Sequence, residues 1–189
     1  MREDLKETRG AREIDRGERF GREAMVYIVM GVEGSGKTTV AKLLAEKLRW
    51  VFLEADQFHS EVNKEKMSKG IPLTDADRMP WLNAMHAELL KENALGNNVI
   101  LACSALKTEY RMVLGAGLPV RYIYLKGSFE LIQSRLKNRH GHFAGEAILA
   151  NQFAVLEEPE NAIVADVTPP PEQIVAGILA KIREEMGAK

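Results

Sequence analysis

The sequence predicts a three-layer α/β protein in which a five-stranded parallel sheet is covered by helices on both of its faces. From residue 25 onward, short apolar runs alternate with segments of helical periodicity. Strands that are apolar along their whole length must be buried on both faces, which is typical of parallel sheets covered by helices. The first apolar run also leads directly into a glycine-rich loop and then a helical pattern, the order found in phosphate-binding α/β proteins.

The predicted elements can be placed along the chain in order. Apolar runs predict strands over residues 25–30, 50–53, 99–103, 120–125 and 162–167. Helical periodicity predicts helices over residues 37–48, 61–69, a long segment after 74, 107–114, a segment through 131–136, one ending near 156 and one ending near 186. We find no internal repeat, so residues 25–189 are predicted to form a single domain.

The longest predicted helix has a clear start signal. Thr74 is a favourable N-cap residue, and Asp77 follows it at the spacing of a capping-box variant. The preceding helical segment is ended by Gly70-Ile71-Pro72. Apolar residues at helical spacing predict the core-facing side of this long helix, namely Trp81, Leu82, Met85, Leu89 and Leu90.

The glycine-rich loop is a complete phosphate-binding motif. Residues 31–38 read Gly-Val-Glu-Gly-Ser-Gly-Lys-Thr and match G-x-x-x-x-G-K-S/T. In this motif backbone N–H groups and the helix N-terminus hold phosphates, the lysine reaches the β- and γ-phosphates, and the hydroxyl holds Mg²⁺. A glycine-rich turn that matches by chance is the alternative, and the strand–loop–helix context argues against it. We therefore predict ATP and Mg²⁺ as cofactors, with the nucleotide bound by Gly31, Gly34, Ser35, Gly36, Lys37, Thr38 and Thr39.

Two carboxylates follow the second predicted strand, at the edge of the sheet where the phosphate loop lies. Ligands of open parallel sheets gather at the carboxyl ends of the strands. We predict that Asp56 accepts the proton of an attacking hydroxyl, and that Glu54 holds Mg²⁺ through water. His59, just after them, is a candidate hydrogen-bond donor to a substrate hydroxyl. A solvated acidic turn is the alternative for the carboxylates, and their place beside the phosphate loop makes it less favourable.

Three arginines are candidates for binding anions. Arg78 suits a bidentate grip on a substrate carboxylate. Pairing of Arg78 with Asp75 or Asp77 is an equally good interpretation from spacing alone. Arg135 and Arg139, four residues apart on one helix, are predicted to stabilise charge on the transferring phosphoryl group, and the loop near 139–146 is predicted to be a lid that excludes water. A solvated basic helix face is the alternative.

Net charge, apolar run length and cysteine content restrict the classes of partner and the cellular compartment that the sequence predicts. The 189-residue chain has a net charge of −1, which gives no support for nucleic acid or an anionic membrane as a partner. No apolar stretch approaches the roughly 20 residues that span a bilayer, and one cysteine fits a reducing compartment. Residues 1–24 are dense in charges of both signs and are predicted to be a disordered extension, without the features of a secretory or mitochondrial signal.

Several segments together resemble the gluconokinase family of P-loop small-molecule kinases. They are residues 31–39, 66–73, Asp75-Ala76-Asp77-Arg78 with Pro80-Trp81-Leu82, Cys103-Ser104-Ala105-Leu106-Lys107 with Tyr110-Arg111, 124–129, 134–136, 141–143, and Gln152-Phe153 with Leu156-Glu157. The resemblance covers about residues 25–185, and the joint order of these segments is far more specific than the phosphate loop alone.

The resemblance implies a P-loop kinase fold like that of shikimate and adenylate kinases. It implies ATP- and Mg²⁺-dependent phosphorylation of D-gluconate at its 6-hydroxyl, giving 6-phosphogluconate, by a cytoplasmic enzyme that is a homodimer. The gluconate carboxylate favours Arg78 as its partner. The hydroxyls of gluconate would be bound by His59 and polar side chains of residues 54–60 and 103–107, such as Ser104 and Lys107.

The chain departs from the usual family pattern at several positions. Glu54 stands where the pattern has Asp, Ser60 where it has Pro, and Glu33 where a small residue is usual; Ala144-Gly145 replaces Met-Pro after Phe143. These departures motivate two rival hypotheses. One is a kinase for another polyhydroxy acid, and the other is a catalytically weak nucleotide-binding regulatory protein that signals through its charged extension.

Overall fold

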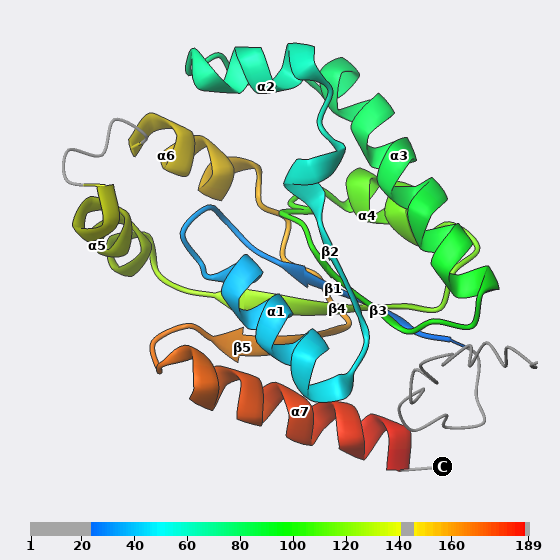
Figure 1. The fold of residues 1–189 in the computed structure, drawn as a ribbon. Helices are drawn as coiled ribbons and strands as arrows, with labels where there is room; N and C mark the ends of the chain where they lie inside the picture. Colours follow the sequence, from blue (N-terminus) through cyan, green and yellow to red (C-terminus); the bar gives the residue numbers. More distant parts are fainter. Residues whose placement is uncertain (1–23, 141–145, 188–189) are drawn as a thin grey trace, which may run out of the picture.

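The sheet has five parallel strands, as the apolar runs predict. The structure, a computed structural model of the chain, describes residues 24–140 and 146–187. The strand order is β2-β3-β1-β4-β5, with every neighbouring pair parallel (Figure 1). The strands are β1 (Val26–Met30), β2 (Val51–Glu54), β3 (Val99–Ala102), β4 (Val120–Lys126) and β5 (Ala162–Asp166). The predicted extension over residues 1–24 lies outside the described residues except for Ala24.

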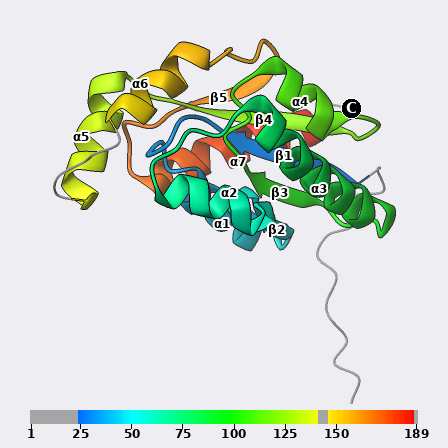
Figure 2. The same ribbon diagram turned by 90° about the horizontal axis from the view of Figure 1, so that it is seen from above.

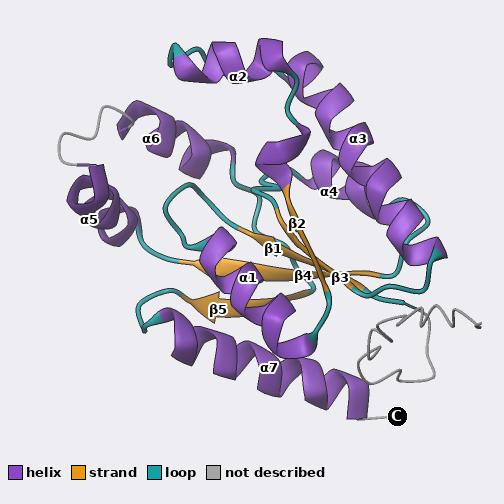
Figure 3. Ribbon diagram, viewed as in Figure 1, coloured by secondary structure: helices purple, strands orange, loops and turns teal. Residues whose placement is uncertain are grey.

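The helices also lie where periodicity places them, with ends shifted by a residue or two. They are α1 (Lys37–Leu48), α2 (Glu61–Ser68), α3 (Asp75–Ala94), α4 (Thr108–Gly115), α5 (Phe129–His140), α6 (Glu146–Val155) and α7 (Pro171–Gly187) (Figure 3). A short 3₁₀ helix, η1 (Ala55–Phe58), follows β2 and was not predicted, because a single turn carries no periodic signal. Among the described residues, none of the helices has the length and hydropathy needed to cross a membrane.

Both faces of the sheet are covered, which explains why β1 is apolar throughout. Tyr27 and Val29 pack in the core beneath α1 and α7. Val26, Ile28 and Met30 pack in the opposite core beneath α3 and α4. Alternate side chains of a strand point to opposite faces, so every residue of this central strand is buried. Figure 2 shows α5 and α6 side by side at one end of the molecule.

The start of α3 confirms the capping prediction. The Asp77 N–H donates to Thr74 Oγ1 at 3.2 Å, and the Thr74 N–H donates to the Asp77 carboxylate at 3.0 Å. The predicted core face of α3 is right for Trp81, Leu82, Met85 and Leu89, which are buried, and wrong for Leu90, which is 42% exposed. Leu90 is one residue beyond Leu89, and the helical rotation of about 100° per residue turns it away from the sheet.

Candidate active site

Most of the predicted site residues line one cavity of about 980 Å³ at the carboxyl ends of β1, β2 and β3. Its wall includes Gly34, Gly36, Lys37, Thr38, Thr39, Glu54, Asp56, His59, Arg78, Ser104 and Lys107. Gly31 and Ser35 belong to the same loop but do not line the cavity. This position is where ligands bind in open parallel sheets, because loops from neighbouring strands meet there.

The phosphate loop has the backbone geometry that its glycines predict. Gly34 has φ 78° and Gly36 has φ 94°, a region that side chains rarely adopt. A Cβ at Gly34 would lie 2.7 Å from Leu136 Cγ on α5, so a side chain there would also clash. No side chain among the described residues caps α1, so its first N–H groups are available to an anion.

A buried hydroxyl in the loop supports an anionic ligand. Ser35 Oγ is buried and has no hydrogen-bond partner within the described part of the chain. A buried polar group without a partner is costly, so such groups commonly face a ligand or water. The loop amides, the open start of α1 and this hydroxyl therefore fit the phosphates of a nucleotide.

The Lys37 side chain folds back onto the backbone of the phosphate loop. Its Nζ donates to the Val32 carbonyl oxygen at 3.0 Å. Burial lowers the pKa of the Lys37 ammonium, while the negative charges of Asp56, Glu33 and Glu54, among others, act in the opposite direction. A desolvated cation at this position interacts more strongly with phosphate than an exposed lysine does.

Thr38 and Glu54 come together from different elements. The Thr38 hydroxyl, at the start of α1, hydrogen-bonds to the Glu54 carboxylate at the end of β2. Burial raises the pKa of Glu54, and the hydrogen bond from Thr38 and the charge of Lys37 oppose that rise. An ionisable carboxylate beside a hydroxyl is the donor set with which Mg²⁺ is usually held, together with water and phosphate oxygens. Asp56, two residues on in η1, is exposed to the cavity.

His59 stacks on an aromatic ring, a contact that spacing alone did not reveal. Its ring stacks on Trp81 of α3 with the centroids 4.4 Å apart and the planes 5° apart. The Trp81 indole donates to the Ala55 carbonyl oxygen at 2.7 Å, which fixes the stack against η1. Burial lowers the pKa of His59, so the imidazole is neutral near pH 7. His59 Nδ1 is buried without a partner among the described residues and can serve a ligand.

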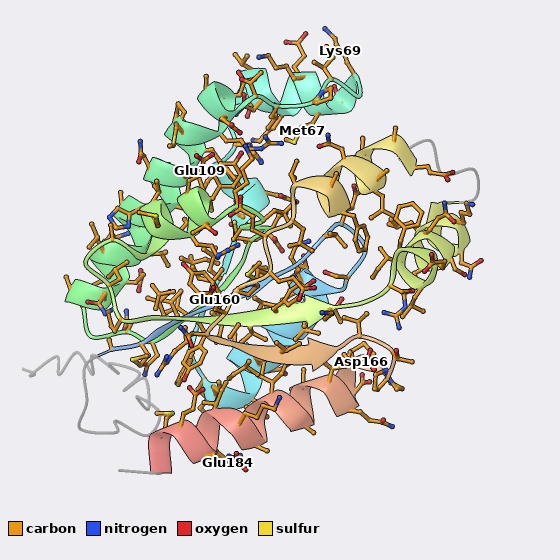
Figure 4. All side chains as sticks on the ribbon, turned by 180° about the vertical axis from the view of Figure 1, so that it is seen from behind. Met67, Lys69, Glu109, Glu160, Asp166 and Glu184 are labelled. Atoms are coloured by element: carbon orange, nitrogen blue, oxygen red, sulfur yellow. The ribbon has the colours of Figure 1, made fainter. Side chains whose placement is uncertain are left out.

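Asp75 organises a second group on the cavity wall, and sequence reasoning missed its role and that of Tyr110. The Lys107 ammonium donates to Asp75 Oδ2 at 2.7 Å, and the Tyr110 hydroxyl donates to Asp75 Oδ1. These hydrogen bonds lower the pKa of Asp75. Lys107 also lies 3.6 Å from Glu109, which is labelled in Figure 4.

The structure bears on one of the two interpretations of Arg78, pairing with Asp75 or Asp77, and binding of a substrate carboxylate stays a prediction. Its guanidinium lies 3.7 Å from Asp75, at the edge of ion-pair distance, and 3.5 Å from the Tyr110 hydroxyl. Asp77 instead pairs with Lys66 at 2.7 Å. Arg78 lines the cavity, so its remaining donors are placed for a ligand anion.

Arg135, one of the two arginines of α5 predicted to stabilise the phosphoryl group, does not line this cavity. Arg135 donates through Nη2 to the Val167 carbonyl oxygen at 2.6 Å and the Thr168 carbonyl oxygen at 3.4 Å, next to the end of β5. The side chain of Arg139 and residues 141–145 of the predicted lid lie outside the described residues. Their roles in phosphoryl transfer stay predictions.

A contact across 119 residues ties α6 to the phosphate loop. The Glu33 N–H donates to Gln152 Oε1 at 2.6 Å, while the Glu33 side chain is exposed. Gln152 and Asn151 line the cavity from α6. A glutamine inside a helix carries no sequence signal for such a contact, so it could not be predicted.

Comparisons with known proteins find relatives that match most of the chain. Residues 26–159 match the family model described as an AAA domain. A probable gluconokinase from Mus musculus is 44% identical over 179 residues, covering 84% of this chain and 97% of the relative. The thermoresistant gluconokinase of Escherichia coli is 42% identical over 164 residues, with 84% and 94% covered. The crystal structure of a gluconokinase from Sinorhizobium meliloti superposes with a TM-score of 0.77 at 36% identity, covering 88% of this chain and 96% of that one.

Proposed function

Because the chain belongs to the gluconokinase family of P-loop kinases, we propose that it transfers the γ-phosphoryl group of ATP to the 6-hydroxyl of D-gluconate. The product would be 6-phosphogluconate. The observation that carries this proposal is one cavity that joins a phosphate loop, a carboxylate and a cationic wall. Each part suits one piece of the reaction: the triphosphate, the attacking hydroxyl and the acidic substrate.

The nucleotide side of the cavity would bind and neutralise the triphosphate. The loop amides, that of Ser35 among them, would hold the phosphate oxygens, and Lys37 would turn from the Val32 carbonyl to the β- and γ-phosphates. Thr38 and Glu54 would hold Mg²⁺, with Glu54 acting through water. When bound, Mg²⁺ neutralises charge on the β- and γ-phosphates.

We propose Asp56, which lines the cavity, as the group that takes the proton. The bond between O6 of gluconate and the γ-phosphorus forms as the bond from that phosphorus to the β–γ bridging oxygen breaks. The O6 proton passes to the Asp56 carboxylate, and ADP leaves. Arg135 and Arg139 are proposed to approach the γ-phosphoryl group from α5, where they would stabilise the developing charge.

The other wall of the cavity would recognise gluconate. Arg78 and Lys107 offer cationic donors to the carboxylate, and Ser104 and the neutral His59 imidazole offer hydrogen bonds to its hydroxyls. A site that hydrogen-bonds several hydroxyls rejects analogues that lack them, because its buried polar groups would then be left unpaired.

A coupled assay tests the proposal directly. NADPH formed by added 6-phosphogluconate dehydrogenase is followed with ATP, Mg²⁺ and D-gluconate. The substrate panel includes other aldonates, shikimate and neutral polyols, with ADP formation as the readout for acceptors that the coupling enzyme does not use. We expect the highest kcat/KM with D-gluconate. Equal turnover across the aldonates would favour a kinase for another polyhydroxy acid, and ATP binding without turnover would favour a regulatory protein.

Replacing Arg78 by glutamine is expected to raise the KM for gluconate about tenfold or more, because a charge-assisted hydrogen bond contributes roughly 1.5–3 kcal/mol. The KM for ATP should stay within about twofold, because Arg78 lies on the substrate wall. Lys66→Gln is the matched control: it removes a cation from the same region, but that cation pairs with Asp77 and does not line the cavity. An equal effect of both variants would contradict a specific role for Arg78.

Replacing Glu54 by glutamine is expected to raise the Mg²⁺ concentration for half-maximal activity about tenfold, since outer-sphere ligands commonly contribute that much to metal affinity. The same change should raise the thermal unfolding temperature of the ligand-free protein near neutral pH. Burial raises the pKa of Glu54, so ionising it opposes folding, and this cost is lost as the pH falls through the raised pKa. The stabilisation should therefore shrink at about pH 4.

Magnesium titrations and thermal melts at both pH values measure the two effects. Glu46→Gln on α1, whose side chain is exposed and does not line the cavity, is the control. If Glu54→Gln leaves the Mg²⁺ dependence unchanged, Glu54 is not a metal-side residue.

The compartment and the assembly of the enzyme are also part of the proposal. We propose a cytoplasmic homodimer that binds neither nucleic acid nor a membrane, since the near-neutral charge favours none of those partners. We also propose that residues 25–189 form the catalytic domain and that residues 1–24 are dispensable for it. Light scattering of the full chain and the activity of a chain lacking residues 1–24 test these points.

A further inference from the structure

The turn that carries Ser104 and Lys107 has an unfavourable backbone conformation. It follows β3 and lies against the phosphate loop, where the Gly31 N–H donates to the Ser104 carbonyl oxygen at 3.4 Å. Ala105 has φ 44°, and among the described residues only Arg49 shares a positive φ without being glycine. A non-glycine residue stays in this region only when its surroundings hold it there.

Arg111 on α4 holds the turn from inside. Its guanidinium is buried, with the residue only 8% exposed. Nη1 donates to the Ala105 carbonyl oxygen at 2.9 Å and the Leu106 carbonyl oxygen at 3.0 Å, and Nη2 donates to Thr108 Oγ1 at 2.9 Å. One nitrogen of the planar guanidinium therefore holds two successive carbonyls of the turn, and the other holds the Thr108 hydroxyl at the start of α4.

Glu157 holds the same turn from the segment after α6. Its carboxylate accepts a hydrogen bond from the Thr108 N–H at 2.7 Å, and its own N–H donates to the Leu106 carbonyl oxygen at 2.9 Å. Lys107 is the N-cap residue of α4 and makes no side-chain cap hydrogen bond. Glu157 thus supplies, from 49 residues away, the acceptor that the helix start lacks.

We propose that Arg111 and Glu157 are positioning residues for the substrate wall: they hold the 104–107 turn so that Ser104 and Lys107 face the cavity. This inference rests on the proposed gluconate kinase activity. Neither residue lines the cavity, so each acts through the turn and not by touching the substrate. Loss of either contact would let Ala105 relax toward a common conformation and would turn Ser104 and Lys107 away from the ligand.

Glu157 is the better residue to test, because it is exposed and its replacement should leave the fold intact. We expect Glu157→Ala to raise the KM for gluconate about tenfold, with the KM for ATP within about twofold. Glu157→Gln keeps an acceptor oxygen for the Thr108 N–H and should recover most of the loss. Glu158→Ala is the matched control, because Glu158 is the adjacent carboxylate but pairs with Lys126 at 2.8 Å.

A double-mutant cycle separates positioning from general stability. If Glu157 acts through Lys107, Glu157→Ala should raise the gluconate KM much less in a Lys107→Met background than in the native chain. A purely structural role would instead give additive effects and would change the apparent affinity for ATP as well. Arg111→Lys, which keeps the charge but loses the planar fork, should raise the gluconate KM in the same direction if it folds.

The outcomes distinguish this inference from the proposed function. If the native chain does not phosphorylate gluconate, the proposed function fails, whatever the variants do. If the native chain does so and Glu157→Ala has the native KM, or shifts it no more than Glu158→Ala, the positioning role is wrong. Gluconate-induced shifts in the unfolding temperature of each variant give a readout that does not depend on turnover.

Discussion

Lys37→Ala is expected to lower kcat at least about a thousandfold, equivalent to about 4 kcal/mol of transition-state stabilisation. The ammonium is the cation of the phosphate loop, and it already lies half-buried beside the loop, where it donates to the Val32 carbonyl oxygen. In a desolvated site a charge that meets the developing negative charge of the phosphoryl group has a large effect. The ammonium is the group that this variant loses, so the fall in kcat would measure its effect on the β- and γ-phosphates.

Stability measurements should show that the fold of this variant is intact. Burial lowers the pKa of Lys37, which means that the folded state disfavours its charged form. Removing the charge is therefore not expected to lower the free energy of unfolding, and Lys37→Met, which keeps the aliphatic stem, controls for lost packing. Lys42→Ala is the matched control, because Lys42 lies on the same helix and lines the same cavity. Turnover above about one tenth of the native value in Lys37→Ala would contradict the assignment.

Asp56→Asn is the second change with a large expected effect, lowering kcat about a hundredfold to ten-thousandfold. Asparagine is close to isosteric but cannot accept the proton of the gluconate 6-hydroxyl. Because Asp56 is exposed to the cavity and its role is in the proton transfer, the KM values for ATP and gluconate should change little. The result would be an enzyme that binds ATP and gluconate but transfers the phosphoryl group very slowly.

Binding and turnover have to be measured separately in this variant. Unfolding temperatures with and without gluconate report binding, and the coupled assay reports turnover. Glu61→Gln, an exposed carboxylate nearby that pairs with Lys64 at 2.7 Å, is the control for loss of a negative charge. If Asp56→Asn keeps the native kcat, another group accepts the proton. If gluconate no longer stabilises the variant, Asp56 binds substrate and does not act mainly as a base.

Glu54 bears on the most visible departure of this chain from the family pattern. The extra methylene of Glu against Asp does not separate it from Thr38, because the two side chains still form a hydrogen bond. Burial raises the pKa of Glu54, so this carboxylate takes up a proton at a higher pH than an ordinary exposed glutamate does. A Mg²⁺ requirement that rises at low pH would then be expected of this chain, which has Glu54 where the family pattern has Asp.

The sheet, the helices and the phosphate loop could be predicted from the sequence because each depends on residues close together in the chain. Strand β1 is apolar on both faces, the phosphate motif is eight consecutive residues, and the capping box of α3 joins Thr74 to Asp77. Local signals of this kind follow from periodicity and backbone preference. Leu90 shows their limit, because the width of a buried helix face depends on what packs against it.

Contacts between residues distant in sequence could not be predicted and are seen only in the folded structure. His59 stacks on Trp81, Lys107 and Tyr110 share Asp75, Gln152 reaches the Glu33 N–H, and Glu157 caps α4. Each needs two elements to be packed at one distance and angle, and no spacing along a single chain encodes that. Motifs along the chain predicted the phosphate loop and the edge of the sheet at which it lies, because both follow from local residue order. Packing of α3, α4 and α6 around that edge decided which side chains face the cavity and which hold the others in place.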